Sequence, residues 1–335
     1  MQVPFVFGPG DLRLNEVPTP RASPGDVVLR VGTVGVCGSD LAYVAAGGPN
    51  GPSEAPVPLG HELTAVVAHV GKDVTGFAPG NRVVVNPLIN LIGNGGPEGG
   101  FAPWLLIRDV DLKPQSLLHL PDSISMDHGA LVEPLAVGMH AVNQLGAQGG
   151  DKVAIFGAGP IGLCALAALR HKGVSDTIVF DLSPFRRERA LQLGAMAVFD
   201  PREVPLRDAL ARHHGTVPLF RREAPATTHF IEASGAPVLE EIIALARTRA
   251  RICVVALHKK PANMDFAQVM TKELTLTGAM GYPRELEDAL AMLAQEGFDP
   301  EPLISHRFGG ADVMDAFAAA ADCDNSAKVL VRYDT

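Results

Sequence analysis

The feature that most constrains the fold is a glycine turn between an apolar segment and a helix-forming segment. Residues 153–156 (Val-Ala-Ile-Phe) have the pattern of a buried strand, and residues 157–162 (Gly-Ala-Gly-Pro-Ile-Gly) follow directly. A helical stretch then runs to about His171, and a second strand leads into Asp181, 19 residues after Gly162. Strand, glycines, helix, strand and acid in this order predict the first βαβ unit of a dinucleotide-binding fold.

Each residue of the turn has a predicted role. Gly157 permits the tight turn, Gly159 lets the backbone approach a pyrophosphate, and Gly162 allows close packing of the helix. Pro160 suits the first helical turn, where its missing N–H would have no partner. The helix N-terminus offers amide donors and a positive dipole end to phosphate. The alternative is a glycine-rich turn with a structural role only.

Asp181 sets the expected cofactor preference. A carboxylate at this place in the fold binds the ribose hydroxyls of the adenosine half. It would also repel a 2′-phosphate, so the sequence predicts NAD rather than NADP. Arg186 and Arg187 lie close by in the sequence and would soften that preference.

The rest of the chain divides into a β-rich part, an alternating part and a return segment. Residues 27–85 contain short β-rich runs separated by Gly, Pro and Asp turns, whereas strands and helices alternate after residue 138. Such alternation predicts an α/β fold with a doubly wound parallel sheet. We predict domains at 1–137 and 138–277, with 278–335 returning to the first domain.

Composition excludes several classes of function. The net charge is −9 and no long basic run occurs, which argues against a nucleic-acid partner. No stretch reaches the roughly 20 apolar residues of a membrane span, and no secretory leader pattern is present, so we expect a cytoplasmic protein without membrane contact. The four cysteines form no C-x-x-C pair, which argues against a disulfide framework.

Three separated segments carry side chains that suit a metal. Cys37 lies in Gly-Val-Cys-Gly-Ser-Asp, the pair His61-Glu62 follows Leu-Gly, and Glu133 precedes Pro-Leu. Thiolate, imidazole and carboxylate are common zinc ligands. Each residue alone also has an ordinary reading, as a small buried thiol, a loop histidine, a surface acid or a helix-start charge.

Together with the glycine turn, these segments resemble the ordered signature of zinc-containing medium-chain dehydrogenases. The likeness is greatest for the sorbitol, idonate and butanediol dehydrogenase branch, and it extends from about Val27 to the closing strand. It implies a GroES-like β-rich catalytic domain beside a Rossmann domain. It also implies an enzyme that takes a small alcohol or polyol substrate, and we expect a homo-oligomer, either a dimer or a tetramer.

The resemblance assigns the metal ligands. It implies that Cys37, His61 and Glu62 hold zinc and that Glu133 binds the zinc or its water. A zinc ion with one thiolate and one carboxylate is already formally neutral, so a second carboxylate ligand would weaken its Lewis acidity. We therefore favour an indirect or exchanging role for Glu133.

The resemblance also implies substrate and cofactor contacts. Ser39 matches a proton-relay residue, and the substrate pocket is assigned Tyr43, Tyr282 and Trp104, although ordinary packing is an equal alternative for the tyrosines and the tryptophan. The likeness extends on the cofactor side to Ile161, Arg186, Val255, Ala256, Leu257, Ala279, Met280 and Gly281.

Two departures from the family pattern matter. Where many relatives carry a cysteine-rich lobe, residues 86–99 contain no cysteine, so we predict one catalytic zinc per subunit and burial of Leu88, Ile89, Leu91 and Ile92 in its place. Gly281 stands where sorbitol-type relatives have an arginine, and Ala42 where they have a relay histidine. A sorbitol-like substrate is thereby put in doubt.

The function that follows is hydride transfer between a secondary alcohol, a polyol or a vicinal diol, and NAD. Zinc would stabilise the negative charge on the alcohol oxygen while the cofactor accepts the hydride. One alternative is a zinc-free quinone or enone reductase on the same fold. Another is a nonenzymatic NAD(H)-binding sensor, since a fold alone never proves a function.

Overall fold

The computed structural model describes residues 1–333, which divide into two compact units. The first unit comprises Met1–Glu133, Leu286–Asp322 and the chain from Ser326, and the second comprises Pro134–Glu285 with Cys323–Asn325. The limit predicted at 138 differs from the observed one by four residues and that at 278 by eight, and Cys323–Asn325 of the predicted return segment belong to the second unit. The predicted segment 278–335 ends outside the described range.

The first unit is built mainly from strands. They are β1 (Gln2–Gly8), β2 (Asp11–Glu16), β3 (Val27–Val36), β4 (Val57–Pro58), β5 (Glu62–Val70), β6 (Arg82–Val85), β7 (Trp104–Ile107), β8 (Leu117–His119), β17 (Ile304–Gly309) and β18 (Lys328–Arg332). Its helices are α1 (Gly38–Ala46), α2 (Met126–Gly129), α9 (Leu286–Leu293) and α10 (Val313–Ala321), with short 3-10 turns at η1 (Pro114–Ser116), η2 (Glu301–Leu303) and η3 (Gly310–Asp312). Helix α3 (Val132–Leu145) begins at the end of this unit.

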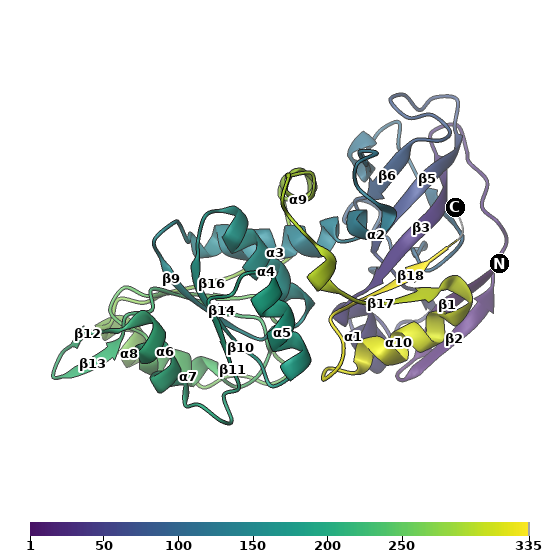
Figure 1. Cartoon of the computed structure of the whole chain (residues 1–335). Helices are drawn as coiled ribbons and strands as arrows, with labels where there is room; N and C mark the ends of the chain where they lie inside the picture. Colours follow the sequence, from purple (N-terminus) through teal and green to yellow (C-terminus); the bar gives the residue numbers. More distant parts are fainter. Residues whose placement is uncertain (334–335) are drawn as a thin grey trace. The chain divides into compact units, whose positions relative to one another are not determined.

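Strand β3 is the centre of the first unit. The larger sheet has the order β17-β18-β3-β5-β6-β8, with β7 also paired to β3, and a smaller sheet has the order β2-β1-β4. Figure 1 shows β3 with its neighbours β5 and β18. Nine of the ten residues of β3 are buried, as its near-continuous run of valine and leucine predicts. Helix α10 covers the core, where the rings of Phe317 and Phe101 lie 5.1 Å apart.

The second unit alternates strands with helices. The strands are β9 (Lys152–Phe156), β10 (Asp176–Phe180), β11 (Ala197–Phe199), β12 (Thr216–Leu219), β13 (Arg222–Pro225), β14 (His229–Glu232), β15 (Arg251–Val254) and β16 (Thr275–Gly278). The helices are α4 (Pro160–His171), α5 (Pro184–Gln192), α6 (Leu206–His214), α7 (Leu239–Leu245) and α8 (Phe266–Thr271).

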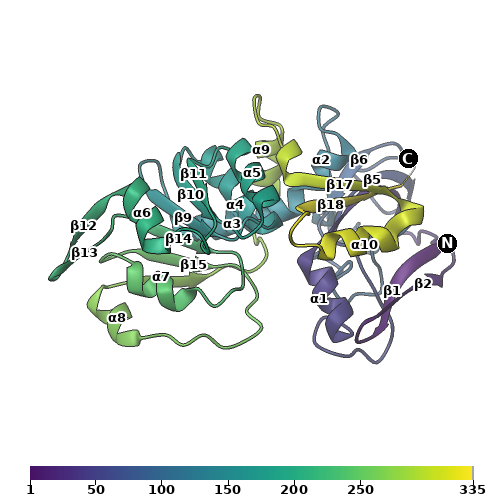
Figure 2. The same ribbon diagram turned by 60° about the horizontal axis from the view of Figure 1, so that its bottom comes forward.

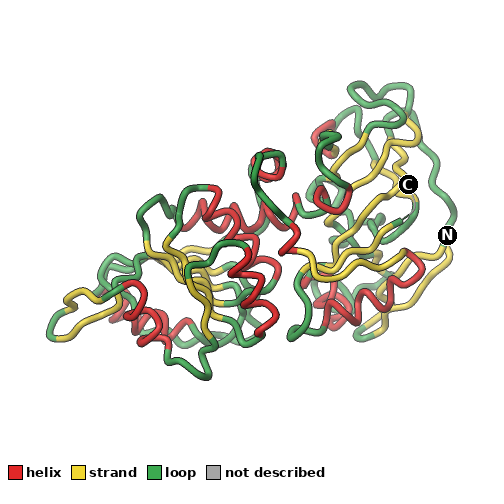
Figure 3. The backbone as a smooth tube through the Cα atoms, viewed as in Figure 1, coloured by secondary structure: helices red, strands yellow, loops and turns green. Residues whose placement is uncertain are grey.

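Six of these strands form a wholly parallel sheet in the order β11-β10-β9-β14-β15-β16, while β12 and β13 form a separate hairpin. Helices flank both faces of the sheet (Figures 2 and 3). The predicted α/β class and doubly wound sheet are therefore confirmed. Ligands of such sheets bind at the carboxyl ends of the strands, which here lead into Gly157, Asp181, Ala233 and Val255.

The prediction for residues 86–99 is partly wrong. Ile92 is buried, but Leu88 and Leu91 are 48% and 51% exposed. This loop turns through backbone hydrogen bonds, from Gly93 N to the Glu98 carbonyl and from Gly96 N to the Leu91 carbonyl, rather than through a cluster of buried side chains. No helix among residues 1–333 is long and apolar enough to cross a membrane.

Candidate functional site

Three predicted metal ligands meet at one end of β3 and β5. Cys37 follows β3 and caps the N-terminus of α1, while Glu62 is the first residue of β5. Antiparallel pairing sets Gly35 opposite Glu62, so residues distant in sequence become neighbours. One ligand atom from each of Cys37, His61 and Glu62 lies within 4.8 Å of the others, the only such group found among residues 1–333.

Asp40 organises this cluster and was not foreseen. It is fully buried, and its carboxylate accepts hydrogen bonds from Cys37 N at 2.9 Å and Gly60 N at 3.2 Å. The same carboxylate lies 3.5 Å from Nδ1 of His61. Asp40 thereby places a negative charge beside Nδ1, which makes no hydrogen bond, while Nε2 lies beside Ser39. The capping-box position, three residues after Cys37, is the sequence signal that could have revealed it.

Lys328 is a second unforeseen neighbour. Its Nζ donates a hydrogen bond to Oε1 of Glu62 at 2.6 Å and another to the carbonyl of Val36 at 3.1 Å. Both Lys328 and Glu62 are buried. Gly35 makes room for the pair, since a Cβ there would lie 2.2 Å from Oε2 of Glu62.

Ser39 and Tyr43, both in α1, contact polar side chains outside that helix. Ser39 Oγ lies 3.3 Å from Nε2 of His61, and the Tyr43 hydroxyl donates a hydrogen bond to Oδ1 of Asn94 at 3.3 Å. Burial raises the pKa of Tyr43, so its hydroxyl stays protonated and able to donate. Asn94 was not foreseen, because nothing in the sequence links it to Tyr43.

The chemistry of this cluster fits a divalent cation. Thiolate, imidazole and carboxylate form a donor set typical of zinc. Burial opposes a charge on His61, but the negative charges of Asp40 and Cys37 outweigh it and hold the pKa of the imidazole well above its usual range. The cluster therefore creates a negative potential that attracts positive charge.

The other residues predicted near the metal do not belong to the group of three ligands. Glu133 lies in the first turn of α3, is 8% exposed and does not belong to the three-residue group. Trp104 begins β7, pairs with Arg30 of β3 and is partly buried. Tyr282 belongs to the second unit and is almost completely buried.

The second unit contains a cavity of about 390 Å³ beside the glycine turn. Its lining includes Gly157, Gly159, Asp181 and Arg186. Asp181 accepts hydrogen bonds from Ala158 N at 2.6 Å and from Ser183 N at 2.8 Å, so its carboxylate joins the ends of two adjacent strands.

The three glycines differ in what surrounds them. Gly157 has a φ of +97°, and a Cβ at Gly162 would lie 1.9 Å from the Gly157 carbonyl, so the turn needs both. A Cβ at Gly159 would meet nothing closer than Nη1 of Arg186 at 3.8 Å. The protein itself therefore leaves the space beside Gly159 open.

The loops predicted to contact the nicotinamide follow β15 and β16. Val255 and Ala256 donate backbone hydrogen bonds to the carbonyl of Glu232, and Ala279 donates to Val254. Leu257 and Met280 are strongly exposed, and Gly281 has a φ of +65°. The fully buried carboxylate of Glu232 was not foreseen, and by accepting hydrogen bonds from Gly235 N at 2.9 Å and from His258 at 2.7 Å it links the turn after β14 to the loop after β15.

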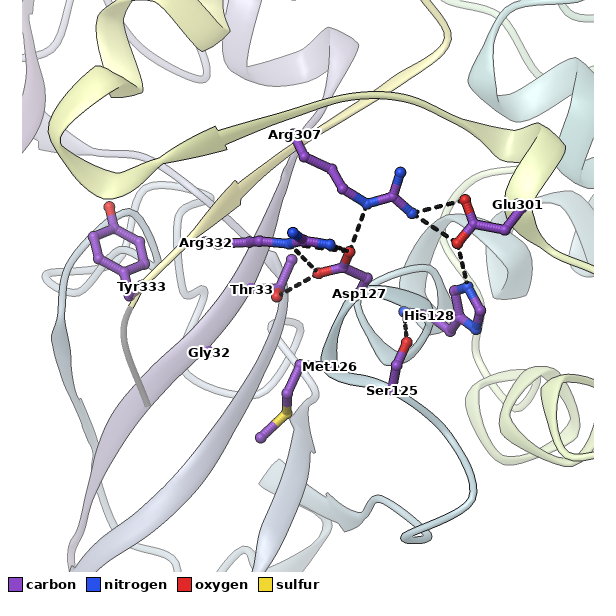
Figure 4. Close-up of a pocket in the computed structure, with 10 residues that line it drawn as sticks. All are labelled: Gly32, Thr33, Ser125, Met126, Asp127, His128, Glu301, Arg307, Arg332 and Tyr333. Carbon is purple, nitrogen blue, oxygen red and sulfur yellow. Dashed lines mark hydrogen bonds and ion pairs between the residues drawn. The ribbon is translucent and has the colours of Figure 1, made fainter.

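A separate hollow of about 460 Å³ lies in the first unit (Figure 4). Asp127 of α2 accepts hydrogen bonds there from Arg307, at 2.7 Å, and from Arg332, while Arg307 also binds Glu301. Burial alone would raise the pKa of Asp127, but the hydrogen bonds from Arg332 and Arg307 outweigh it and lower that pKa. No predicted site residue lines this hollow, and its opposed charges satisfy one another.

Comparisons with known proteins match both units. The chain matches a family described as "Alcohol dehydrogenase GroES-like domain" over residues 23–113 and one described as "Zinc-binding dehydrogenase" over residues 160–295. (R,R)-butanediol dehydrogenase of Bacillus subtilis (strain 168) is 32% identical, over 96% of each chain. Sorbitol dehydrogenase of Homo sapiens is 30% identical, over 93% of this chain and 90% of the relative. The crystal structure of 2R,3R-butanediol dehydrogenase from Bacillus subtilis has a TM-score of 0.86 at 29% identity, covering 99% of both chains.

Proposed function

The chain belongs to the zinc-dependent alcohol dehydrogenases of the medium-chain dehydrogenase/reductase type, and on this premise we propose that it oxidises a polyol or vicinal diol at a secondary alcohol, with NAD as hydride acceptor. The observation that carries the proposal is the cluster of Cys37, His61 and Glu62, within 4.8 Å of one another, in a chain that also has a glycine-lined cavity. A zinc-free reductase would have no use for that cluster.

Residues of the first unit would bind the metal, position its ligands and accept the substrate proton. Cys37, His61 and Glu62 would hold the zinc, which supplies a Lewis acid that stabilises negative charge on the alcohol oxygen. Asp40, 3.5 Å from Nδ1 of His61, would favour one orientation of the imidazole. Ser39, 3.3 Å from Nε2 of His61, would receive the proton of the substrate hydroxyl. Glu133, outside the three-residue group, keeps an indirect role.

Substrate recognition is assigned to the side chains around Ser39. Tyr43 would contact the substrate, with its hydroxyl direction fixed by Asn94. Trp104 and Tyr282 remain candidates for the apolar wall. Because Gly281 supplies no cation, a short diol suits the proposal better than a long sugar alcohol.

The second unit would hold NAD. Gly159 leaves open space for the pyrophosphate at the start of α4, and Asp181 would bind the ribose hydroxyls, with Arg186 beside them. Residues 255–257 and 279–281 would contact the nicotinamide. The negative charge of Asp181 supports a preference for NAD over NADP.

A panel of diols, polyols and simple secondary alcohols tests the proposal with NAD as acceptor. We expect the highest kcat/KM for a vicinal diol and loss of activity when a chelator removes zinc, while NADH binding survives. Full turnover by verified zinc-free protein would refute the metal assignment. Absence of oxidation of every alcohol in the panel would refute the substrate class.

Elemental analysis tests the metal content. We propose one zinc per chain, because residues 86–99 offer no cysteine for a structural site. Metal-free protein should stay folded by circular dichroism. Two tightly held zinc ions per chain, or unfolding on chelation, would contradict the proposal of a single zinc that serves catalysis alone.

We further propose a homo-oligomer in the cytoplasm. The four cysteines are all free thiols, which suits a reducing compartment. Strand β16 forms one edge of the parallel sheet, and the exposed apolar side chains of Phe266, Met270 and Met280 lie in the same part of the chain. Light scattering tests the association, and a monomeric mass would overturn it.

A further inference from the structure

Lys328 is a buried charge that the proposed mechanism does not use. It is 1% exposed, and the carboxylate that accepts its hydrogen bond belongs to Glu62, one of the three clustered metal-site residues. Buried lysines are costly unless they are paired. Here the partner, Glu62, is also a proposed zinc ligand, so the ion pair would affect the metal site as well as the stability of the fold.

The position of Lys328 is fixed by the sheet. It is the first residue of β18, which pairs antiparallel with β3, Val329 opposite Val36 and Leu330 opposite Gly35. The Val36 carbonyl accepts a second hydrogen bond from Nζ at 3.1 Å, which keeps the ammonium beside Glu62. A residue at the end of the chain is thereby held against the start of β5.

Charge counting gives this contact its meaning. The formal charges of Zn²⁺, the Cys37 thiolate and the Glu62 carboxylate sum to zero. The ammonium of Lys328 adds one positive charge to the site. The carboxylate also shares its electron density between a cation and a hydrogen-bond donor, which makes it a weaker ligand. Both effects leave the zinc a stronger Lewis acid.

We propose that Lys328 is a positioning residue that weakens the bond between Glu62 and zinc. The protein then binds zinc less tightly, and the zinc is a stronger Lewis acid. The inference rests on the proposed function, because it needs Cys37, His61 and Glu62 to be the zinc ligands. A residue with only a structural role would act in the opposite direction, since its loss would disorder Glu62 and loosen the metal.

The sign of the change in zinc affinity therefore tests the proposal. Lys328→Met removes the charge with little change in volume, and metal-free protein is titrated with Zn²⁺ alone against a chromophoric chelator. We expect about tenfold tighter zinc binding, because a neighbouring positive charge has been removed, together with about a tenfold lower kcat. Lys328→Arg keeps the charge, so its zinc affinity and kcat should stay close to those of the wild type.

Lys272 provides a matched control. It is also a buried lysine, 2% exposed, but its Nζ donates only to the carbonyls of Ile243 and Ala244 in the second unit. Lys272→Met should lower stability without changing zinc affinity. Should Lys328→Met fail to fold, Lys328→Gln keeps a donor for Glu62 without the charge and is measured in the same way.

The possible outcomes distinguish an error in the zinc-ligand assignment from an error in the role of Lys328. A wild-type chain that takes up no zinc would overturn the ligand assignment itself. Wild-type uptake with equal or weaker uptake by the neutral variants at Lys328, or with unchanged kcat, would overturn only the role of Lys328. Tighter zinc and slower turnover together would establish it.

Discussion

The glycine turn of the second unit and the metal cluster of the first unit are assembled in different ways. Residues 157–162 are consecutive, and the strand and helix on either side bring their backbone atoms together. The cluster draws on the turn after β3, the start of β5 and the start of β18, and the ion pair between Glu62 and Lys328 joins residues 266 positions apart. The turn depends on local backbone geometry, whereas the cluster depends on the register of a sheet.

This difference predicts how each site fails. A local backbone site is broken by adding an atom, because its glycines are needed for the space they leave. A site assembled through sheet register is broken by removing a side chain or a charge, because its side chains sit on rigid strands that remain in place. The following substitutions test that contrast.

The largest effect is expected when the cluster loses a ligand. Cys37→Ala and His61→Ala should each lose the zinc and lower kcat/KM by more than about 100-fold, since even supporting residues around a metal cost roughly 10- to 100-fold. NADH binding, followed by fluorescence, should be unchanged. Cys253→Ala, which alters a fully buried thiol in β15, is the control and should retain zinc. Wild-type activity in either ligand variant would falsify the assignment.

The glycines should separate folding from binding. Gly162→Ala places a Cβ 1.9 Å from the Gly157 carbonyl and should lower the free energy of unfolding by about 3 kcal/mol. Gly159→Ala meets no atom closer than 3.8 Å and should leave stability unchanged while weakening NADH binding by about tenfold. Denaturant unfolding and NADH titration give the two readouts. The reverse pattern would mean that the open space at Gly159 is not the phosphate site.

A buried histidine in each unit has a shifted pKa, and the two shifts have opposite directions. The charges around His61 raise its pKa, whereas burial lowers the pKa of His214 in α6 to about 4, so His214 is neutral at pH 7. In the unfolded chain His214 titrates near 6.5, so the unfolded state binds more protons and stability falls as the pH drops from 6.5 toward 4. We expect this group to cost about 3 kcal/mol by pH 4.

Variants of the two neighbouring histidines isolate that effect. His214→Asn should flatten the dependence of the unfolding free energy on pH between 7 and 4, even where its stability at pH 7 is lower. His213→Asn changes the exposed neighbour, whose charge contributes only in part to the lowered pKa of His214, and should alter the slope much less than His214→Asn does. Equal slopes in His214→Asn and the wild type would contradict the assignment.

The smallest effect concerns cofactor choice. Asp181→Asn removes the charge that opposes a 2′-phosphate, so the ratio of kcat/KM with NAD to that with NADP should fall about tenfold. Glu188→Gln makes the same change of charge on the exposed side of α5 and should leave the ratio unchanged. If Asp181→Asn kept the full preference, another group would have to exclude the phosphate.

The sequence predicted the parallel sheet well, because the strand, glycine turn and helix of a βαβ unit are contiguous in the chain. It also identified Cys37, His61 and Glu62, which the structure brings within 4.8 Å, although their roles remain predictions. Lys328 was missed, because its relation to Glu62 depends on the pairing of β18 with β3. No local pattern encodes that pairing.

The error at residues 86–99 has a different cause. Apolar residues in a short loop predicted burial, yet Leu91 is exposed and has a φ of +53°. Backbone hydrogen bonds determine this turn, and a turn can fix the direction of its side chains without regard to their hydropathy. Asn94, which accepts the hydrogen bond from Tyr43, was missed for the same reason.

The pairing of β18 with β3 also has a consequence for biosynthesis. A ribosome delivers β3, β5 and the whole of Pro134–Glu285 before it delivers β18, so a nascent chain can complete most of its second unit while the first still lacks a strand. Until then the Thr33–Val36 edge of β3 has no partner on that side, and Glu62 has no ammonium beside it. The surroundings of Glu62 are therefore completed only after Pro134–Glu285 has been synthesised, and until then the open edge of β3 offers unpaired backbone groups to other strands.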